Sequence, residues 1–165
     1  MKPTDSHHAG TVDTATSLGT FRFSMSAILI AVDGSRPSEQ ALSFALEQYS
    51  DADLVALSVL DPSAVAQGSP EFIVTDTSAW MERAEARVQS VLDDAGRRAD
   101  EAGVDLATDF VYGSPARAIV QYATDHDVDQ VVVGSHGRDG VSRLLLGSVA
   151  ETVVRRSPVP VTVVR

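Results

Sequence analysis

Two segments of the sequence carry the residue types from which an anion-binding site can be built. Asp33–Ser35 follows the apolar run Ala27–Val32, and Gly134–Gly137 closes a second apolar run; nine residues then separate Gly137 from the pair Gly147-Ser148. Glycine lets the backbone approach a ligand, and a Gly-Ser pair that opens a helix presents free N–H groups, a hydroxyl and the positive end of the helix dipole. The pattern therefore predicts phosphate-binding chemistry that needs no lysine.

The helix after this glycine motif has two interpretations. In the first it begins at Gly147-Ser148, because Gly-Ser is a good helix start and a glycine inside a helix costs about 1 kcal/mol relative to alanine. In the second, one helix runs from Val141 to Arg156, since the apolar residues of that range fit a single helical period. We favour the first, although a bent helix would also leave N–H groups available to a ligand.

Hydrophobic periodicity alternates between strand and helix from Ala27 onward. Alternation of this kind requires a mostly parallel sheet with helices on both faces. The ligand crevice of such a sheet lies beyond the carboxyl ends of the strands, where the strand order reverses. We expect strands at Ala27–Val32, Leu54–Leu60, Val104–Tyr112, Gln130–Gly134 and Val159–Val164, and helices over Ser35–Tyr49, over Ser78–Ala102, after Ser114, and up to Arg156.

Two segments fall outside this pattern. Residues 1–25 are rich in serine and threonine and have no helical or strand period, so we expect a disordered N-terminal extension followed by one domain over 26–165. The extension lacks the apolar core of a signal peptide, and Met25 is an alternative start of translation. Asp61–Thr77 is longer than a usual connection in such folds, and is either a lid or an excursion from the domain.

The balance of charges narrows the classes of function. The chain has 13 Lys and Arg against 23 Asp and Glu, a formal net charge of −10, whereas nucleic-acid-binding modules concentrate basic residues on one face. We therefore expect no nucleic-acid partner. No apolar run approaches the roughly 20 residues of a membrane span. The chain has no cysteine, which excludes disulfides, zinc–thiolate sites and thiol nucleophiles.

The acidity itself has two interpretations. Dense carboxylates keep a protein soluble in a salt-rich, halophilic cytoplasm, where screening removes their mutual repulsion. Ordinary acidic solubility is the other interpretation. Measuring the melting temperature at increasing KCl concentration distinguishes the two interpretations. If the melting temperature does not rise toward molar KCl, the halophilic interpretation is wrong.

With these motifs in this strand–loop–helix order, the chain resembles the universal stress protein family, specifically its ATP-binding subclass. The resemblance covers Ser26–Arg165. It rests on Ile28–Ser35, on the spaced motif Gly134-x2-Gly137-x9-Gly147-Ser148, and on the closing segment Arg155–Val164. It implies a Rossmann-like α/β fold: an open five-stranded parallel sheet in the order 3-2-1-4-5, with helices on both faces.

The resemblance also implies which residues hold an adenine nucleotide. Asp33 and the backbone of Val59 would hold the adenine and ribose side, the motif glycines would line the ribose and phosphates, and Ser148 would help to grip the outer phosphates. A Mg or Mn ion is implied with the ATP, and its ligands are left unassigned. The implied cofactor-binding set is Ala31, Val32, Asp33, Val59, Gly134, Ser135, His136, Gly137, Arg138, Gly147, Ser148 and Val149.

Some of these side chains have alternatives. Asp33 is either a nucleotide contact or a solvated turn residue, and Arg138 either reaches a phosphate or pairs with a nearby acid. We expect His136 to be a loop histidine rather than a catalytic one. We expect His126, among several aspartates, to cap a helix end rather than to bind a metal.

Family members dimerise through the last strand, and residues 159–164 look like that apolar edge, so we expect a homodimer through this strand. The expected function is a cytoplasmic, nucleotide-dependent regulatory module of the stress response. Without a Walker lysine, an assured arginine finger or a positioned base, we expect at most slow ATP hydrolysis. The alternatives are a nucleotide-free interaction module of the same family, or a weak ATPase or adenylating enzyme.

Overall fold

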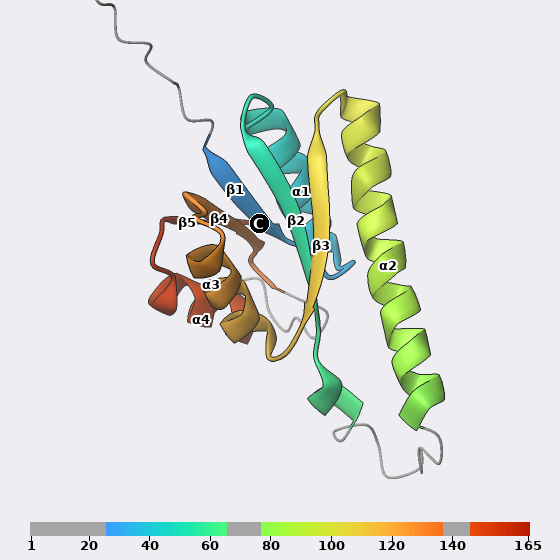
Figure 1. The fold of residues 1–165 in the computed structure, drawn as a ribbon. Helices are drawn as coiled ribbons and strands as arrows, with labels where there is room; N and C mark the ends of the chain where they lie inside the picture. The colour runs from blue at the N-terminus through green and yellow to red at the C-terminus, as the bar shows by residue number, and fades with distance from the viewer. Residues whose placement is uncertain (1–25, 66–76, 137–145) are drawn as a thin grey trace, which may run out of the picture.

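Five parallel strands form the central sheet of the molecule (Figure 1). The structure, a computed structural model, describes residues 26–65, 77–136 and 146–165. The strand order is β3-β2-β1-β4-β5 and every neighbouring pair is parallel, which confirms the predicted order. The strands are β1 (Ala27–Ala31), β2 (Asp53–Leu60), β3 (Leu106–Tyr112), β4 (Gln130–Gly134) and β5 (Val161–Val164).

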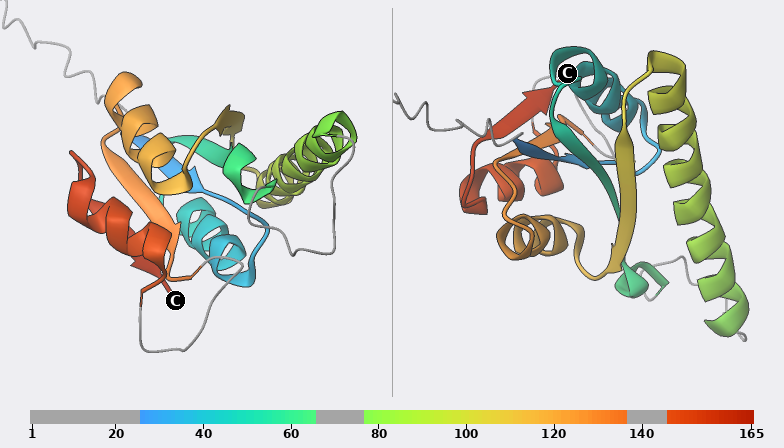
Figure 2. Two further views of the ribbon diagram at one scale, coloured as in Figure 1. Left: turned by 90° about the horizontal axis from the view of Figure 1, so that it is seen from below. Right: turned by 45° about the horizontal axis from the view of Figure 1, so that its top comes forward.

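Helices cover both faces of this sheet, as predicted (Figure 2). One core cluster joins the sheet to α1 and α2, and a second joins the opposite face to α3 and α4. The helices are α1 (Arg36–Gln48), α2 (Thr77–Ala102), α3 (Pro115–Asp125) and α4 (Ser148–Arg156), and a short 3-10 turn, η1 (Pro62–Val65), follows β2.

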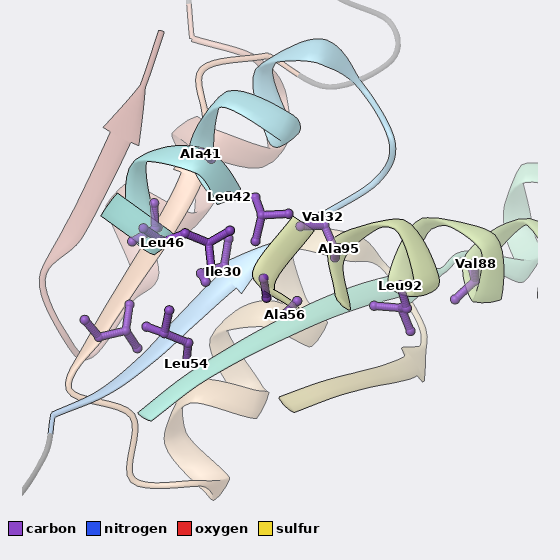
Figure 3. Packing of buried hydrophobic residues seen from close by; sticks show 14 of the residues in the cluster. Ile30, Val32, Ala41, Leu42, Leu46, Leu54, Ala56, Val88, Leu92 and Ala95 are labelled. Atoms are coloured by element: carbon purple, nitrogen blue, oxygen red, sulfur yellow. The ribbon is translucent and has the colours of Figure 1, made fainter. Parts of the chain in front are cut away.

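The neighbouring strands β1 and β4 are buried on both sides of the sheet, because each face of the sheet is covered by its own pair of helices. In β1, Ile28 and Ile30 belong to the α1–α2 cluster and Leu29 to the α3–α4 cluster, in the two-residue alternation of a strand. Figure 3 shows Ile30 among the side chains of the first cluster. Such double burial makes the apolar runs of β1 and β4 continuous, so their existence was easy to predict from the sequence.

The long helix α2 packs on the sheet through an apolar stripe and ends in a glycine cap. Val88, Leu92 and Ala95 of that stripe are buried in the α1–α2 cluster. Gly103 has φ +69°; its N–H donates to Asp100 O, and the Val104 N–H donates to Ala99 O at 3.0 Å. This is the hydrogen-bond pattern of a Schellman cap. Because Val104 is used in the cap, β3 begins at Leu106 rather than at the predicted Val104.

The start of α4 decides between the two interpretations of the last helix. Helix α4 begins at Ser148 with Gly147 as its N-cap, and Leu146 and Gly147 are not helical. The single helix from Val141 to Arg156 is therefore wrong. Gly147 has φ −63° and ψ 154°, an extended conformation that takes the chain out of the helix. After α4, the strand β5 begins at Val161 rather than Val159, because Pro160 has no N–H to donate to a ladder.

Several predictions concern other parts of the chain. Residues 1–25, predicted to be a disordered extension, and residues 66–76 of the expected lid or excursion lie outside the described residues. Of the helices that the structure describes, none combines the length and the apolar character needed to cross a membrane.

Candidate functional site

The carboxyl ends of β1 and β4 lie side by side, at the point where the strand order reverses. The register pairs Leu29 with Val131 and Ile30 with Val132, so the segments that follow the two strands leave the sheet next to each other. On one side of β1 the sheet continues with β2 and β3, and on the other side it continues with β4 and β5. This is the position at which open parallel sheets hold their ligands.

The turn after β1 is held by short local hydrogen bonds. Asp33 Oδ1 accepts from the Ser35 N–H at 2.9 Å, which closes an Asx turn, and Gly34 between them has φ +76°. A side chain at Gly34 would be strained at this φ, and its Cβ would also lie 2.9 Å from Val91 Cγ2 of α2. The half-buried Asp33 carboxylate is thus a structural part of the turn, whether or not it also contacts a ligand.

Two buried serines connect this turn to the first turn of α1. Ser35 is the N-cap of α1, and its Oγ accepts from the Ser38 N–H at 3.3 Å. Ser38 Oγ in turn donates to Ser35 O at 2.9 Å and accepts from the Asp33 N–H at 3.3 Å. The role of Ser38 was missed in the sequence, although a serine in the first turn of a helix is known to hydrogen-bond the backbone three residues earlier.

Gly134, at the end of β4, packs directly against the backbone of α1. A Cβ at this position would lie 2.5 Å from Pro37 C, 2.6 Å from Pro37 O and 2.8 Å from Ser38 N. The sequence suggested that Gly134 lets the backbone approach a ligand, whereas the described contact is with helix α1. The glycine therefore sets how closely the end of β4 and the start of α1 can lie.

The residues after Gly134 join β4, α4 and β5. The Ser135 N–H donates to Val164 O at 2.7 Å, and Ser135 O accepts from the Gly147 N–H at 2.7 Å. His136 is half-buried, with Nδ1 3.1 Å from Ser135 Oγ, and its Nε2 is buried with no hydrogen-bond partner in the described part of the chain. His136 thus lies outside the helices and strands, with its ring packed against the end of the sheet.

The first turn of α4 offers hydrogen-bond donors beside this strand end. The first N–H groups of any helix lack partners within the helix, and Gly147 has no side chain that could cap them. Ser148 is exposed at the start of the helix, while Val149 is half-buried and packs in the α3–α4 cluster. The helix dipole adds a partial positive charge here, so this end of α4 favours an anion.

The predicted site residues are brought together only in part. The Asp33 turn follows β1, Gly134 ends the neighbouring strand β4, and Ser135 is hydrogen-bonded to Gly147. Ala31 ends β1, while the side chain of Val32 packs in the α1–α2 cluster and its N–H donates to Leu57 O at 2.9 Å. Val59 lies near the end of β2, the other neighbour of β1. Gly137 and Arg138 lie outside the described residues.

A metal site made by side chains alone is not found in the described parts of the chain. No group of three or more His, Asp or Glu residues there is placed to hold an ion.

His126 is the C-cap of α3, as predicted, and its ring stacks on Tyr122 with a centroid distance of 3.9 Å. Burial, and then a hydrogen bond to Asp109, raise the pKa of Tyr122 to about 12, so its hydroxyl remains a donor.

The fold defines an α/β protein with a parallel sheet that is covered by helices on both faces and whose strand order reverses between β1 and β4. The family model described as the universal stress protein family matches residues 25–165. A relative, universal stress protein MJ0531 of Methanocaldococcus jannaschii, is 35% identical over 144 residues, which cover 84% of this chain and 81% of the relative. The chain belongs to the universal stress protein family.

Solved structures agree with this assignment. Universal stress protein UspA from Lactobacillus plantarum has a TM-score of 0.69 and 27% identity, covering 85% of this chain and 97% of that one. A universal stress protein in complex with cAMP has a TM-score of 0.63 and 29% identity, covering 86% and 98%. A structural relative of this chain therefore binds an adenine nucleotide.

Proposed function

We propose that this chain binds ATP together with a Mg or Mn ion and acts as a nucleotide-dependent regulatory module of the stress response. The observation that carries the proposal is the start of α4, where the N-cap Gly147 has no side chain to cap the first N–H groups, joined through Gly147 and Ser135 to the end of β4 beside the Asp33 turn. That arrangement favours a phosphate group, and the cAMP-bound relative supports an adenine nucleotide as its source. We propose residues 26–165 as the functional domain, and the cytoplasm as its location.

The residues around this crevice fit a metal ion that arrives with the phosphates. Mg²⁺ is commonly bound through substrate phosphates, its own waters and one or two carboxylates, rather than by a cage of protein ligands. Asp33 is the carboxylate at the crevice, and no larger ligand group exists among the described side chains. Residues 26–165 contain no lysine, so the backbone N–H groups of α4 and the ion would supply the positive charge.

Binding of ATP is therefore expected to depend on the divalent ion. A calorimetric titration of the folded chain with ATP should give a measurable affinity in the presence of Mg or Mn. When EDTA removes the ion, the affinity for ATP should fall about tenfold or more. The nucleotide should also raise the melting temperature, since a ligand that binds only the native state stabilises it.

The matched controls are adenosine, which lacks the phosphates, and GTP, which changes the base. Weak binding of adenosine and of GTP supports a site that recognises both parts of ATP. If ATP with Mg gives neither heat nor a thermal shift, and the purified chain carries no adenine nucleotide, the proposal is wrong.

We also propose that the chain forms a homodimer through residues 159–164. Strand β5 is the last strand in the sheet order, and its side chains are half-buried. Pro160 O and Val164 O accept from Val131 and Ser135 of the β4 side. Because neighbouring strand residues point their backbone groups to opposite sides, the N–H and C=O of Val163 point to the open edge, where a second copy can pair.

Val163→Pro is expected to make the chain monomeric without unfolding it. Proline removes one N–H from the open edge and leaves the hydrogen bonds to β4 in place. Val163→Thr, which keeps the N–H and the branched Cβ, is the control. Light scattering on a sizing column measures the mass, and a Val163→Pro variant that stays dimeric would place the interface elsewhere.

A further inference from the structure

Strand β3 forms the second edge of the sheet, at the end opposite the proposed dimer edge β5 (Figure 1). The N–H of Gly113, directly after β3, donates to Leu60 O of β2 at 2.9 Å. Backbone groups alternate in direction along a strand, so those of Thr108 and Phe110, an odd number of residues from Gly113, point away from β2. The middle of β3 is not covered by a helix, since Thr108 and Asp109 are exposed. The edge therefore has backbone groups in the position where a further strand could pair.

The sequence of β3 is of the kind that pairs readily with another strand. Four of the seven residues of Leu106–Tyr112 are β-branched or aromatic, and none is proline or glycine. Asp109 is the only charged residue of the strand. Segments of this length with high β-propensity and low charge are prone to assemble with copies of themselves when they lie on an exposed edge. Asp109 is thus the one residue of β3 whose charge opposes such pairing.

The carboxylate of Asp109 lies at this edge and is held there through both of its oxygen atoms. Its Oδ1 accepts from the Phe110 N–H, one of the outward-pointing groups, at 2.8 Å. Its Oδ2 accepts from the Tyr122 hydroxyl of α3 at 3.0 Å. Tyr122 is itself buried, and its ring stacks on His126, which fixes the position of the donor. The carboxylate therefore occupies an N–H group that a pairing strand needs and places a negative charge beside it.

A second copy of this chain is the partner that this charge opposes most directly. Two β3 strands related by a two-fold axis run antiparallel, and pairing through the outward groups sets Thr108 opposite Phe110 of the second copy. Asp109 then faces Asp109 of the second copy, with the Cβ atoms about 5 Å apart, and like charges so placed destabilise a strand pair. Strand β5 has no such barrier, because Val161–Val164 contains no charged residue.

We propose that β3 is a second self-association edge of this chain and that Asp109 holds it closed. The proposal concerns the edge opposite β5, so it stands or fails separately from the proposed homodimer and from nucleotide binding. Two self-pairing edges on one chain do not close into a ring, because copies joined in turn through β5 and β3 form an open-ended row. Asp109 thus limits assembly to the pair formed through β5.

The test removes the Asp109 charge from a full-length chain whose β5 edge is blocked by Val163→Pro. Adding Asp109→Thr, a neutral residue that favours strands, should double the mass from monomer to dimer in sedimentation analysis as the protein concentration rises. With the native Val163, Asp109→Thr should instead give masses that keep increasing with concentration, because both edges are then open. If the homodimer through β5 is wrong, Asp109→Thr should give a dimer with either residue at position 163. A monomer of the double variant at every concentration would refute the closed edge.

Two further variants in the Val163→Pro chain separate the role of Asp109 from a general loss of charge or of stability. Asp105→Thr changes the net charge equally, and Asp105 is exposed but lies just before the strand, so its mass should stay that of a monomer. Asp109→Asn removes the charge but keeps an oxygen that can accept from Phe110, and it should associate more weakly than Asp109→Thr. It also provides the same test if Asp109→Thr does not fold. Association of Asp105→Thr as strong as that of the Asp109 variants would show only a loss of charge repulsion and would refute the proposal.

Hydrogen exchange of backbone amides locates the contact in the dimer of the double variant. The amides of Thr108 and Phe110 should exchange at least about tenfold more slowly in the dimer than in the diluted monomer, because they are paired across the new interface. The amides of Val161–Val164 should exchange at the same rate in both. A dimer in which Thr108 and Phe110 gain no protection would place the contact elsewhere and would overturn the proposal.

Discussion

Replacing Gly147 with valine is expected to abolish the binding of ATP with Mg while the chain stays folded. Gly147 is the N-cap of α4, and its φ of −63° and ψ of 154° are accessible to any residue. Its N–H, which donates to Ser135 O, is retained in the variant. The backbone conformation at this position and its hydrogen bond to Ser135 are therefore both compatible with valine.

The loss of binding follows from where the new side chain stands. The first-turn N–H groups of α4 can reach a phosphate only if the cap residue leaves room for it, and valine adds a branched Cβ at that position. We expect the affinity for ATP with Mg to fall at least about a hundredfold, or about 2.8 kcal/mol, in calorimetry.

The stability of this variant is the necessary companion measurement. Valine is a poorer N-cap than glycine, so urea unfolding should show a loss of at most about 1 kcal/mol. Gly96→Ala in α2, where an added Cβ meets nothing within 4 Å, is the control variant and should bind ATP normally. A Gly147→Val protein that keeps its affinity within about threefold would show that the phosphates lie elsewhere.

The strands and helices of this fold could be predicted because each signal is local. The run Gln130–Gly134 is apolar on both faces and is β4 with the same bounds. The helix predicted over Ser35–Tyr49 is α1, with Ser35 as its N-cap and Tyr49 as its C-cap. Errors occurred at element ends such as Val104, where a helix cap competes with the strand for the same N–H group.

The site could be predicted as a set of strand ends but not as a set of contacts. Parallel sheets place the carboxyl ends of β1 and β4 together, and the glycine spacing identified both segments. The reason for one glycine was hidden, because the partner of Gly134 is Pro37, far away in the chain. The buried position of His136 Nε2 was hidden for the same reason, since burial is decided by segments that meet only in the fold.

Replacing Gly134 with alanine is expected to destabilise the whole fold. The new Cβ would lie 2.5 Å from Pro37 C and 2.6 Å from Pro37 O, closer than real side chains approach other atoms. These are backbone atoms in the first turn of α1, and the hydrogen bonds of Ser35 and Ser38 hold that turn in place. The clash can be relieved only by moving α1 or the end of β4.

Either movement separates surfaces that the core needs in contact. Helix α1 carries Ala41, Leu42 and Ala45 of the buried cluster, and β4 is a central strand. Overpacking of a close-packed interior typically costs 1–3 kcal/mol, and a clash with backbone belongs at the upper end. We therefore expect the free energy of unfolding of Gly134→Ala to fall by about 3 kcal/mol in urea denaturation.

The same exchange at Gly96 tests this explanation with identical chemistry. A Cβ at Gly96 meets no atom within 4 Å and alanine is the better helix former, so Gly96→Ala should stabilise the chain by about 0.5–1 kcal/mol. Opposite signs for the two glycine-to-alanine variants would show that Gly134 is needed for the approach of α1 to β4. A stable Gly134→Ala protein that has lost only its affinity for ATP would instead assign this glycine to the ligand.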